Sequence, residues 1–268
     1  MSYRYEGLRD SIVKAVKDDC EGKDVGVAFS GGLDSGLVAA IAKDYADSVT
    51  LYTCGTDTSH DTIMAEELSK ELDLPWVHVK ISEDNVESLI REMIYFFEIP
   101  DPFTISYELQ LYSVCKQSEE KTILSGQGCD EFFMGCAKYV DCPDPDYDIL
   151  VRAGVERLYN VSVPCEKAIV SHFGQEICYP YLNTGVLAEL NEIDPAELRP
   201  ADMDSRKAVL RDIASDLGYG MISERKKKSS QYGSGTTDII RSLAKANGMY
   251  FNQYVLSIYD EIMNGKKS

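Results

Sequence analysis

The 268-residue sequence has few basic residues. It contains 27 Lys and Arg against 45 Asp and Glu, which gives a formal net charge of −18 at pH 7. Proteins that bind nucleic acids use clustered Lys and Arg to offset phosphate repulsion, so we expect no nucleic-acid partner. The only basic run, Arg225–Lys228, is short, and either a small phosphate site or a solvated loop would account for it.

The sequence also lacks long apolar runs. Its longest apolar stretches, such as Gly36–Ala42 and Met93–Phe97, are far shorter than the roughly 20 residues that cross a membrane. Residues 1–6 contain no hydrophobic signal segment. We therefore expect a cytoplasmic protein that has no membrane partner.

Paired cysteines are lacking as well. None of the eight cysteines belongs to a Cys-x-x-Cys pair, which is the spacing typical of zinc and iron–sulfur sites. The chain is too long to resemble a small disulfide-rich secreted domain. These cysteines are best explained as reduced, buried side chains, although ligands that converge from distant segments would leave no such spacing.

What the sequence does contain is a regular alternation of apolar runs and helical segments. This pattern predicts strands at Val25–Phe29, Ser48–Thr53, Trp76–Val79 and Lys121–Ser125. It predicts helices at Gly36–Tyr45, Thr62–Leu72, Asn85–Phe97 and Tyr107–Lys116, with Asp61 as the N-cap of the second helix. Repeated β–α units indicate an α/β fold, with a parallel sheet covered by helices on both faces.

The pattern changes after Cys142. Residues 143–146 (PDPD) form a breaker cluster, and the segments beyond it are mainly helical. Helices are predicted there at Asp148–Tyr159, Cys165–Phe173, Thr184–Leu190, Ser205–Leu217 and Ile239–Ala246. The sequence thus predicts an α/β core over residues 1–143 and a mainly helical lobe over 144–268.

The segment Ser30–Ser35 (SGGLDS) lies between the first strand and the first helix of this pattern. Gly31 and Gly32 are expected to adopt positive φ and to bring backbone N–H groups close to an anion. The two serines supply hydroxyl donors, and Asp34 is placed to hold Mg²⁺. Since no Gly-Lys-Ser/Thr follows, the loop is not a Walker A motif, and it predicts a pyrophosphate site better than an ordinary turn does.

Two further segments follow strand ends, where ligands bind in sheets of this kind. Tyr52–Asp61 could contact adenine through its backbone or could be a polar surface turn. Leu124–Tyr139 is more distinctive, because two glycines precede the adjacent acids Asp130 and Glu131. Asp130 could coordinate Mg²⁺ or hold a substrate ammonium, and Glu131 could cap the helix that begins there.

Together these motifs resemble those of one family. Ser30–Ser35 is similar to the PP-loop of the ATP pyrophosphatases, and with Ser125–Gly135 (SGQGCDEFFMG) it resembles the synthetase domain of asparagine synthase and its relatives, including the β-lactam synthetases. Glu176–Asn183 (EICYPYLN) is similar to the family's Glu-x-Arg-x-Pro-Phe-Leu-Asp. Arg225–Gly235 is similar to its basic C-terminal loop, so matching motifs extend from about residue 25 to 235.

This resemblance implies an adenine nucleotide alpha hydrolase-like fold and a two-step synthesis of an amide. A carboxylate, with aspartate as the expected acid, is adenylated with ATP and Mg²⁺, and ammonia then displaces AMP. It also implies roles for individual residues. Pyrophosphate is held by Ser30, Gly31, Gly32 and Ser35; Mg²⁺ by Asp34 and Asp130; adenosine by the Cys54 backbone, Ser125 and Gly126; and catalysis involves Lys227, Asp130 and Gln127.

The sequence departs from the family in several places. Ser2 follows Met1 where glutamine-dependent members have a nucleophilic cysteine, and about two dozen residues precede the first strand. We therefore expect no glutaminase domain, so that ammonia is used free or comes from a separate glutaminase subunit. Gln127 stands where many members have Glu, and it cannot take a proton at neutral pH. Cys178 and Asn183 replace the usual Arg and Asp, which indicates a changed substrate pocket or altered support of the fold.

Three hypotheses therefore stay open at the level of sequence. The chain could be an asparagine synthase-type ligase, the same type of enzyme acting on a different carboxylate, or a nucleotide-binding partner subunit without turnover. Asp34, Asp130 and the basic run favour an enzyme, whereas Gln127 is the residue that a non-catalytic partner would explain. A homodimer is compatible with each of them.

Overall fold

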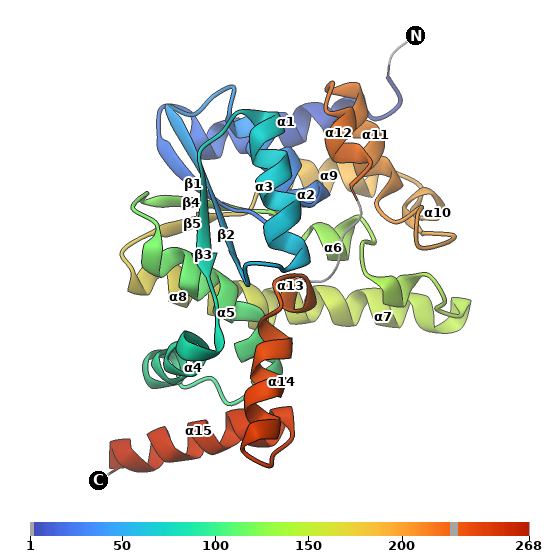
Figure 1. Cartoon of the computed structure of the whole chain (residues 1–268). Helices are drawn as coiled ribbons and strands as arrows, with labels where there is room; N and C mark the ends of the chain where they lie inside the picture. Colours follow the sequence, from blue (N-terminus) through green and yellow to red (C-terminus); the bar gives the residue numbers. More distant parts are fainter. Residues whose placement is uncertain (1–2, 226–229, 268) are drawn as a thin grey trace.

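Five parallel strands form one sheet at the centre of the molecule. Figure 1 shows the computed structural model of the chain, which describes residues 3–225 and 230–267. The strand order is β3-β2-β1-β4-β5. The strands are β1 (Asp24–Ala28), β2 (Ser48–Gly55), β3 (Trp76–Lys80), β4 (Thr122–Ser125) and β5 (Glu176–Cys178). The α/β fold with a parallel sheet is confirmed, and the four predicted strands agree with β1–β4 to within two residues at each end.

The fifth strand was not predicted, and it comes from the half of the chain that we expected to be mainly helical. β5 pairs with β4 in parallel, with Glu176 opposite Thr122 and Cys178 opposite Leu124. Three residues are too few to show a period in the sequence, and pairing with β4 is what makes this segment a strand. The division of the chain at residue 143 stays a prediction.

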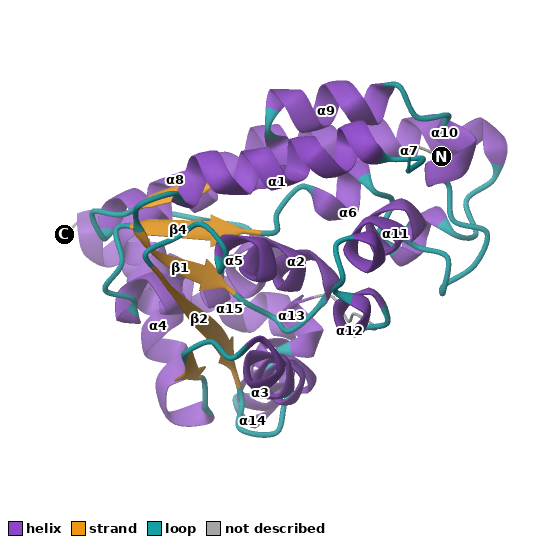
Figure 2. Cartoon of the chain, turned by 90° about the horizontal axis from the view of Figure 1, so that it is seen from above, coloured by secondary structure: helices purple, strands orange, loops and turns teal. Residues whose placement is uncertain are grey.

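Helices surround the sheet on both sides (Figure 2). The helices of the first half are α1 (Glu6–Cys20), α2 (Leu33–Ala42), α3 (His60–Leu72), α4 (Glu83–Phe97), α5 (Pro102–Gln117) and α6 (Cys129–Phe132). Those of the second half are α7 (Asp144–Arg157), α8 (Val163–His172), α9 (Thr184–Asn191), α10 (Pro195–Leu198), α11 (Ala208–Asp216), α12 (Gly220–Ser223), α13 (Ser230–Gly233), α14 (Thr236–Ala246) and α15 (Phe251–Lys267). Short helical turns lie at Ala137–Tyr139, Leu158–Ser162 and Pro180–Leu182.

Several predicted helix starts were wrong, and for two of them the residue that caps the helix explains the difference. The N-cap of α3 is Ser59, whose hydroxyl accepts a hydrogen bond from Thr62 N, and Asp61 lies inside the helix. α5 begins at Pro102, five residues before the predicted start at Tyr107. The carboxylate of Asp101 accepts hydrogen bonds from the backbone N–H groups of the first turn of α5, and proline is well suited to the first helical position.

Helices α1 and α15 were not predicted, although the sequence carries a signal for each. In α1, Leu8, Ile12 and Val16 recur every four residues, and all three are buried. In α15, Tyr254 and Ile258 show the same spacing and pack against the second hydrophobic cluster of the molecule. Apolar residues that recur at three- and four-residue intervals are typical of a helix with one face on the core.

The core is divided into two clusters by the sheet. Val25, Val27 and Leu124 pack with α1, α2 and α9 in one cluster, whereas Tyr52 and Ile123 pack with α4, α5, α8, α14 and α15 in the other. Neighbouring residues of a strand point to opposite faces, which is why Ile123 and Leu124 belong to different clusters. A sheet covered on both faces leaves the carboxyl ends of its strands as the place for a ligand.

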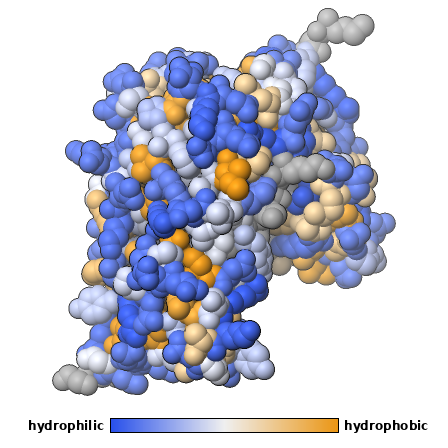
Figure 3. All heavy atoms as spheres, in the orientation of Figure 1, coloured by the Kyte–Doolittle hydropathy of each residue, from blue (hydrophilic) through white to orange (hydrophobic). Residues whose placement is uncertain are grey.

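The face of the molecule that Figure 3 shows is mainly hydrophilic. In Figure 3, blue residues cover most of the visible face, and apolar residues appear in scattered patches. Within residues 3–225 and 230–267, no helix combines the length and the apolar character that crossing a membrane demands. All eight cysteines carry free thiols, and four of them are buried.

Candidate functional site

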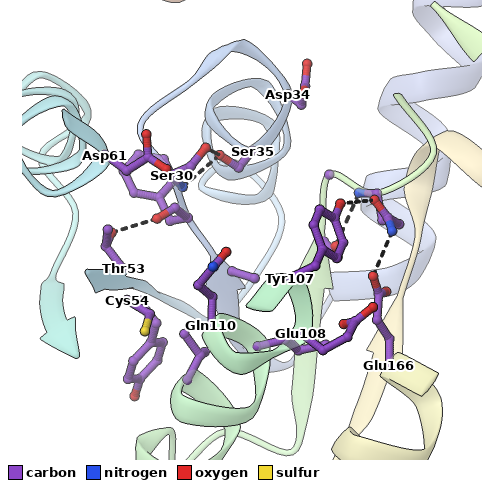
Figure 4. Close-up of a pocket in the computed structure, with 18 of the residues that line it drawn as sticks. Ser30, Asp34, Ser35, Thr53, Cys54, Asp61, Tyr107, Glu108, Gln110 and Glu166 are labelled. Atoms are coloured by element: carbon purple, nitrogen blue, oxygen red, sulfur yellow. Dashed lines mark hydrogen bonds between the residues drawn. The ribbon is translucent and has the colours of Figure 1, made fainter. Parts of the chain in front are cut away.

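A pocket of about 860 Å³, including the part open to solvent, lies where β1, β2 and β4 end (Figure 4). Helices α5 and α8 complete its wall. Eight of the predicted site residues line it: Ser30, Asp34, Ser35, Cys54, Ser125, Gly126, Gln127 and Asp130. Residues from three distant segments therefore meet at one place, and the roles assigned to them stay predictions.

The loop between β1 and α2 is held by its own serines. Ser30 N donates to Ser35 Oγ at 3.1 Å, the two hydroxyl oxygens are 3.3 Å apart, and Gly32 N lies 3.4 Å from Ser30 Oγ. Figure 4 shows Ser30 and Ser35 side by side at the pocket. Because the loop leads into the N-terminus of α2, its N–H groups and hydroxyls form a site suited to phosphate.

Only one of the two glycines in this loop has a positive φ. Gly31 has φ of +70°, and a side chain there would overlap the backbone of Met64 and Ala65 in α3. Gly32, by contrast, is the N-cap of α2 with φ of −85° and ψ of −179°, which is extended backbone. The expectation of positive φ was thus wrong for Gly32, and the close approach of α3 explains why position 31 must be glycine.

The loop after β4 packs directly against the Ser30–Ser35 loop between β1 and α2, which is called the phosphate-type loop below. A Cβ at Gly126 would lie 3.0 Å from Asp34 Cβ and 3.1 Å from Ser35 N. A side chain at Gly128, where φ is +88°, would overlap Leu182, and one at Gly135 would overlap Lys207 and Asp130. The glycines of the Ser125–Gly135 motif are therefore required by close contacts on three sides.

Asp34 and Asp130 converge on one cationic group, the ammonium of Lys207. Lys207 Nζ lies 2.7 and 2.6 Å from the two carboxylate oxygens of Asp34 and 2.6 Å from Asp130 Oδ1. Only 5% of the Lys207 surface is exposed. The buried thiol of Cys129 also donates to Asp34 Oδ1, at 3.2 Å, and burial raises the pKa of this thiol well above its ordinary value, so it stays protonated.

Lys207 was missed in the sequence, because it lies far from every motif. It is the residue that precedes α11, and its φ of +59° is unusual for a residue with a side chain. Such a backbone conformation costs free energy and is retained where the surrounding structure fixes it. Here the strained backbone of Lys207 places its ammonium between two carboxylates, which hold it there.

The same two carboxylates fit a magnesium ion. Mg²⁺ is bound in proteins by one or two carboxylates, with phosphate and water oxygens completing its shell. Asp34 and Asp130 supply such a pair beside the Ser30–Ser35 loop, and they already converge on a positive charge. In the part of the chain that the structure describes, no group of three or more His, Cys, Asp or Glu side chains is placed to bind a metal ion. Phosphate and water oxygens would therefore have to complete the shell of an ion held by Asp34 and Asp130.

Gln127 belongs to a hydrogen-bonded chain at the floor of the pocket. The Tyr107 hydroxyl donates to Gln127 Oε1 at 3.2 Å, and Gln127 Nε2 donates to Glu166 Oε1 at 2.8 Å. The side-chain amide is thus fixed between a residue of α5 and one of α8. The sequence did not predict the acidic partner of Gln127.

A second acid, Glu108 of α5, lies beside Glu166, and both are buried, with 1% and 4% of their surfaces exposed. Burial, followed by the charge of Glu166, raises the pKa of Glu108 well above its ordinary value. Burial also raises the pKa of Glu166, to about 7. Desolvation and a neighbouring negative charge both disfavour the ionised form of a carboxyl group, which accounts for the raised pKa of each residue.

The wall formed by β2 contributes no charged side chain to the pocket. Thr53 Oγ1 donates to Phe29 O at 2.7 Å and accepts from Trp76 Nε1 at 2.9 Å, which ties three neighbouring segments together. Cys54 lines the pocket, and burial raises the pKa of its thiol to about 12. This neutral wall suits a nucleobase, and the contact of the Cys54 backbone with adenosine stays a prediction.

The segment Glu176–Asn183 supports the fold beneath the site. The Tyr181 hydroxyl donates to the Asp34 backbone carbonyl at 3.0 Å, and Asn183 is the N-cap of α9, with its side chain accepting from Gly185 N at 2.9 Å. Neither Cys178 nor Asn183 is among the pocket-lining residues. Of the two explanations for these substitutions, altered support of the fold fits the structure.

Arg225, the first residue of the basic run, is neither solvated nor at the pocket. Its guanidinium is buried, donates to Met64 O at 2.8 Å and Gly31 O at 3.5 Å, and pairs with Glu71 at 3.1 Å. It therefore joins α3 to the phosphate-type loop. Lys227 lies outside the described residues, and its catalytic role stays a prediction.

Comparisons with known proteins point in one direction. A family model described as asparagine synthase matches residues 7–147. A protein described as putative asparagine synthetase [glutamine-hydrolyzing] 1 from Methanocaldococcus jannaschii is 30% identical over 92% of this chain and 52% of its own length. Asparagine synthetase B of Escherichia coli is 27% identical, over 86% of this chain and 44% of its own. The chain thus spans about half the length of these relatives, or less.

Two solved structures show more distant likeness. The NH3-dependent NAD synthetase from Campylobacter jejuni is 15% identical, with a TM-score of 0.35 over 71% of this chain and 93% of that one. NMN synthetase from Francisella tularensis is 13% identical, with a TM-score of 0.37 over 71% and 92%.

Proposed function

The chain belongs to the asparagine synthase family, and we propose that it is an ATP-dependent, AMP-forming amide ligase. In this proposal it adenylates a carboxylate, with aspartate as the first acid to test, and transfers ammonia to the activated acid. The observation that supports the proposal is the convergence of Asp34 and Asp130 on one cation beside the Ser30–Ser35 loop. That arrangement is suited to pyrophosphate, which is the leaving group of adenylation.

The first step uses the residues at the strand ends. A carboxylate is a poor electrophile, and joining it to the α-phosphate of ATP gives it a good leaving group. The hydroxyls of Ser30 and Ser35 and the N–H groups at the start of α2 would hold the departing phosphates. Asp34 and Asp130 would hold Mg²⁺, which neutralises phosphate charge when it is bound.

Lys207 would remain close to the same charges. Its ammonium is fixed by two carboxylates and buried, so it is already oriented before substrates bind. Preoriented positive groups stabilise charge that develops in a transition state, because they need no reorganisation. Lys207 is therefore a candidate for this role together with Lys227.

The second step requires ammonia. Gln127 cannot act as a base, and its hydrogen bonds to Tyr107 and Glu166 suit it to positioning a bound group. Two relatives are described as glutamine-hydrolyzing, which supports a glutaminase as one source of ammonia, while free ammonia is the other. The free thiols are compatible with a reaction in the cytoplasm.

The proposal is tested with purified protein, ATP, Mg²⁺, ammonium and a panel of carboxylic acids. We expect pyrophosphate and AMP to appear in equal amounts with the amide. Asp34→Asn should abolish pyrophosphate release, whereas Asp260→Asn, at an exposed site in α15, should not change it. Release of ADP in place of AMP would contradict the proposal, and the panel separates aspartate from other acids.

A nucleotide-binding partner without turnover is the alternative that Gln127 keeps open. It predicts that ATP–Mg²⁺ binds while no acid in the panel gives pyrophosphate. Calorimetric titration of ATP into the wild-type protein, run beside the panel, separates the two.

A further inference from the structure

We propose that the acidic floor of the pocket, formed by Glu108, Glu166 and Gln127, binds a protonated nitrogen. This nitrogen belongs either to the carboxylic acid that is activated or to the ammonium that supplies the amide nitrogen. The inference rests on the proposed function and narrows its substrate class to acids or donors that carry a positive charge at this position.

The hydrogen bonding of Glu166 leaves one of its oxygens available for a ligand. Glu166 Oε1 accepts from Gln127 Nε2, while Oε2 is buried and has no hydrogen-bond partner among the described residues. Hydrogen bonding by the Tyr179 hydroxyl lowers the pKa of Glu166, although this contact does not meet the ordinary distance and angle limits of a hydrogen bond. A buried carboxylate oxygen without a donor is costly, so a ligand that donates to it would be stabilised.

Glu108 adds a second carboxyl group at the same place. Figure 4 shows Glu108 and Glu166 directed toward one another at one side of the pocket. Buried charges are normally paired with an opposite charge, and two adjacent buried acids lack such pairing. Without such a partner, the raised pKa values of both acids favour their neutral forms. A protonated nitrogen between them would donate to both and would stabilise their ionised forms.

The charged side chains described around the pocket do not supply this positive charge. Of the described residues that line the pocket, five are acids, and none is Lys, Arg or His. Lys207 is held by Asp34 and Asp130, at another part of the site. Arg157 acts electrostatically on Glu108, but its guanidinium lies over the Phe103 ring and bonds Thr104 Oγ1 at 3.4 Å.

The position of the floor suits the end of the acid that does not react. Gln127 follows Gly126, which packs on Asp34 and Ser35, so the floor begins where the phosphate site ends. An acid joined to the α-phosphate would extend from that site toward Glu166. A second carboxylate placed there would be repelled, whereas an ammonium, such as the α-ammonium of an amino acid, would be attracted.

The experiment uses inert acyl-adenylate analogues in matched pairs. Sulfamoyladenosine acylated with 4-aminobutyrate is compared with its pentanoyl counterpart, in which a methyl group replaces the ammonium, and a β-alanyl and butanoyl pair tests a shorter chain. Binding is measured by calorimetry. We expect the cationic member of a pair to bind about 10- to 100-fold more tightly, which is the range for hydrogen bonds to charged groups.

A second arm distinguishes the source of the nitrogen. Binding of the neutral analogues is measured in ammonium chloride and in potassium chloride at equal ionic strength. If the floor holds the nitrogen donor, ammonium should tighten binding of a neutral analogue by a similar factor. The preference for the cationic analogue, or the tightening by ammonium, should fall to about onefold in Glu166→Gln and should decrease in Glu108→Gln. Glu67→Gln, at an exposed site in α3, should retain the effect.

The outcomes separate the two proposals. If cationic and neutral analogues bind equally and ammonium has no effect, the acidic floor does not bind a cation, although adenylation stands. If the preference persists in Glu166→Gln and Glu108→Gln, its cause lies elsewhere and the assignment is overturned. If no analogue binds, the proposed function fails together with the inference. Thermal melting of each variant verifies that it is folded.

Discussion

The Lys207 ammonium lies 2.7 and 2.6 Å from the two carboxylate oxygens of Asp34, although 173 residues separate them in the chain. This contact joins the start of α11 to the first turn of α2. Both partners are buried, so water cannot solvate either charge if its partner is removed. The pair therefore matters for stability as well as for chemistry.

Replacing Lys207 should be strongly destabilising. Lys207→Met leaves Asp34 buried without its cation, and breaking a buried pair from one side typically costs about 3–5 kcal/mol. We expect a lower melting temperature and the loss of pyrophosphate release. Lys167→Met, at an exposed site in α8, is the matched control and should change neither. A Lys207→Met protein as stable as wild type would show that the pair is not needed for folding.

Gly135 should tolerate no side chain. A Cβ there would overlap both Lys207 and Asp130, so Gly135→Ala must displace the ammonium or the carboxylate. We expect a loss of about 1–3 kcal/mol from overpacking, together with a large loss of activity. Gly265→Ala, where α15 leaves open space, should instead be neutral or stabilising. Melting curves and pyrophosphate release measure the two effects, and full activity in Gly135→Ala would contradict this account.

Arg225→Met should loosen the phosphate-type loop without touching the pocket. The variant loses hydrogen bonds to the carbonyls of Met64 and Gly31 and the ion pair with Glu71. Buried carbonyls left without donors cost about 1–3 kcal/mol each, and ATP binding should weaken because the loop is less fixed. Arg152→Met, at an exposed site, is the control. Calorimetric titration of ATP and melting temperature check both expectations, and unchanged ATP affinity would contradict them.

The elements that the sequence predicted best are those whose signal is local. The central strand reads as a continuous apolar run because both faces are covered, and the Ser30–Ser35 loop is recognisable because all its groups are adjacent. Lys207 had no such signal, since only the fold brings α11 to Asp34. β5 was missed because its pairing with β4, and not its composition, makes it a strand.

The two acids of the floor had a signal that could have been found. Glu108 falls on the same helical face as the buried residues Ile105 and Tyr112, and Glu166 falls three residues from Val163 and from Ile169, which are also buried. A charged residue on the apolar face of a helix is rare unless it is paired or functional. What the sequence could not reveal is that the two faces meet, because α5 and α8 are distant in the chain.

The acidic floor should also make stability depend on pH in a particular direction. The pKa of Glu166 is raised by burial from an ordinary 4.5 to about 7, and that of Glu108 is raised in the same direction. The folded state therefore binds protons more tightly than the unfolded state. The stability contributed by Glu166 is fully present below pH 4.5 and is lost as pH rises through about 7. A pKa shift of this size corresponds to a change of roughly 3 kcal/mol in the free energy of unfolding.

Glu166→Gln removes this dependence, because an amide does not titrate and its oxygen can still accept from Gln127. We expect the variant to gain stability relative to wild type as pH is raised from 5 to 8, with little difference between them at pH 4. Using the difference between the two proteins cancels the titration of every carboxylate that they share. Denaturant unfolding at a series of pH values measures it, with Glu67→Gln as the control that should follow wild type throughout. A constant difference across this range would mean that Glu166 ionises normally, and that the floor is less desolvated than its burial indicates.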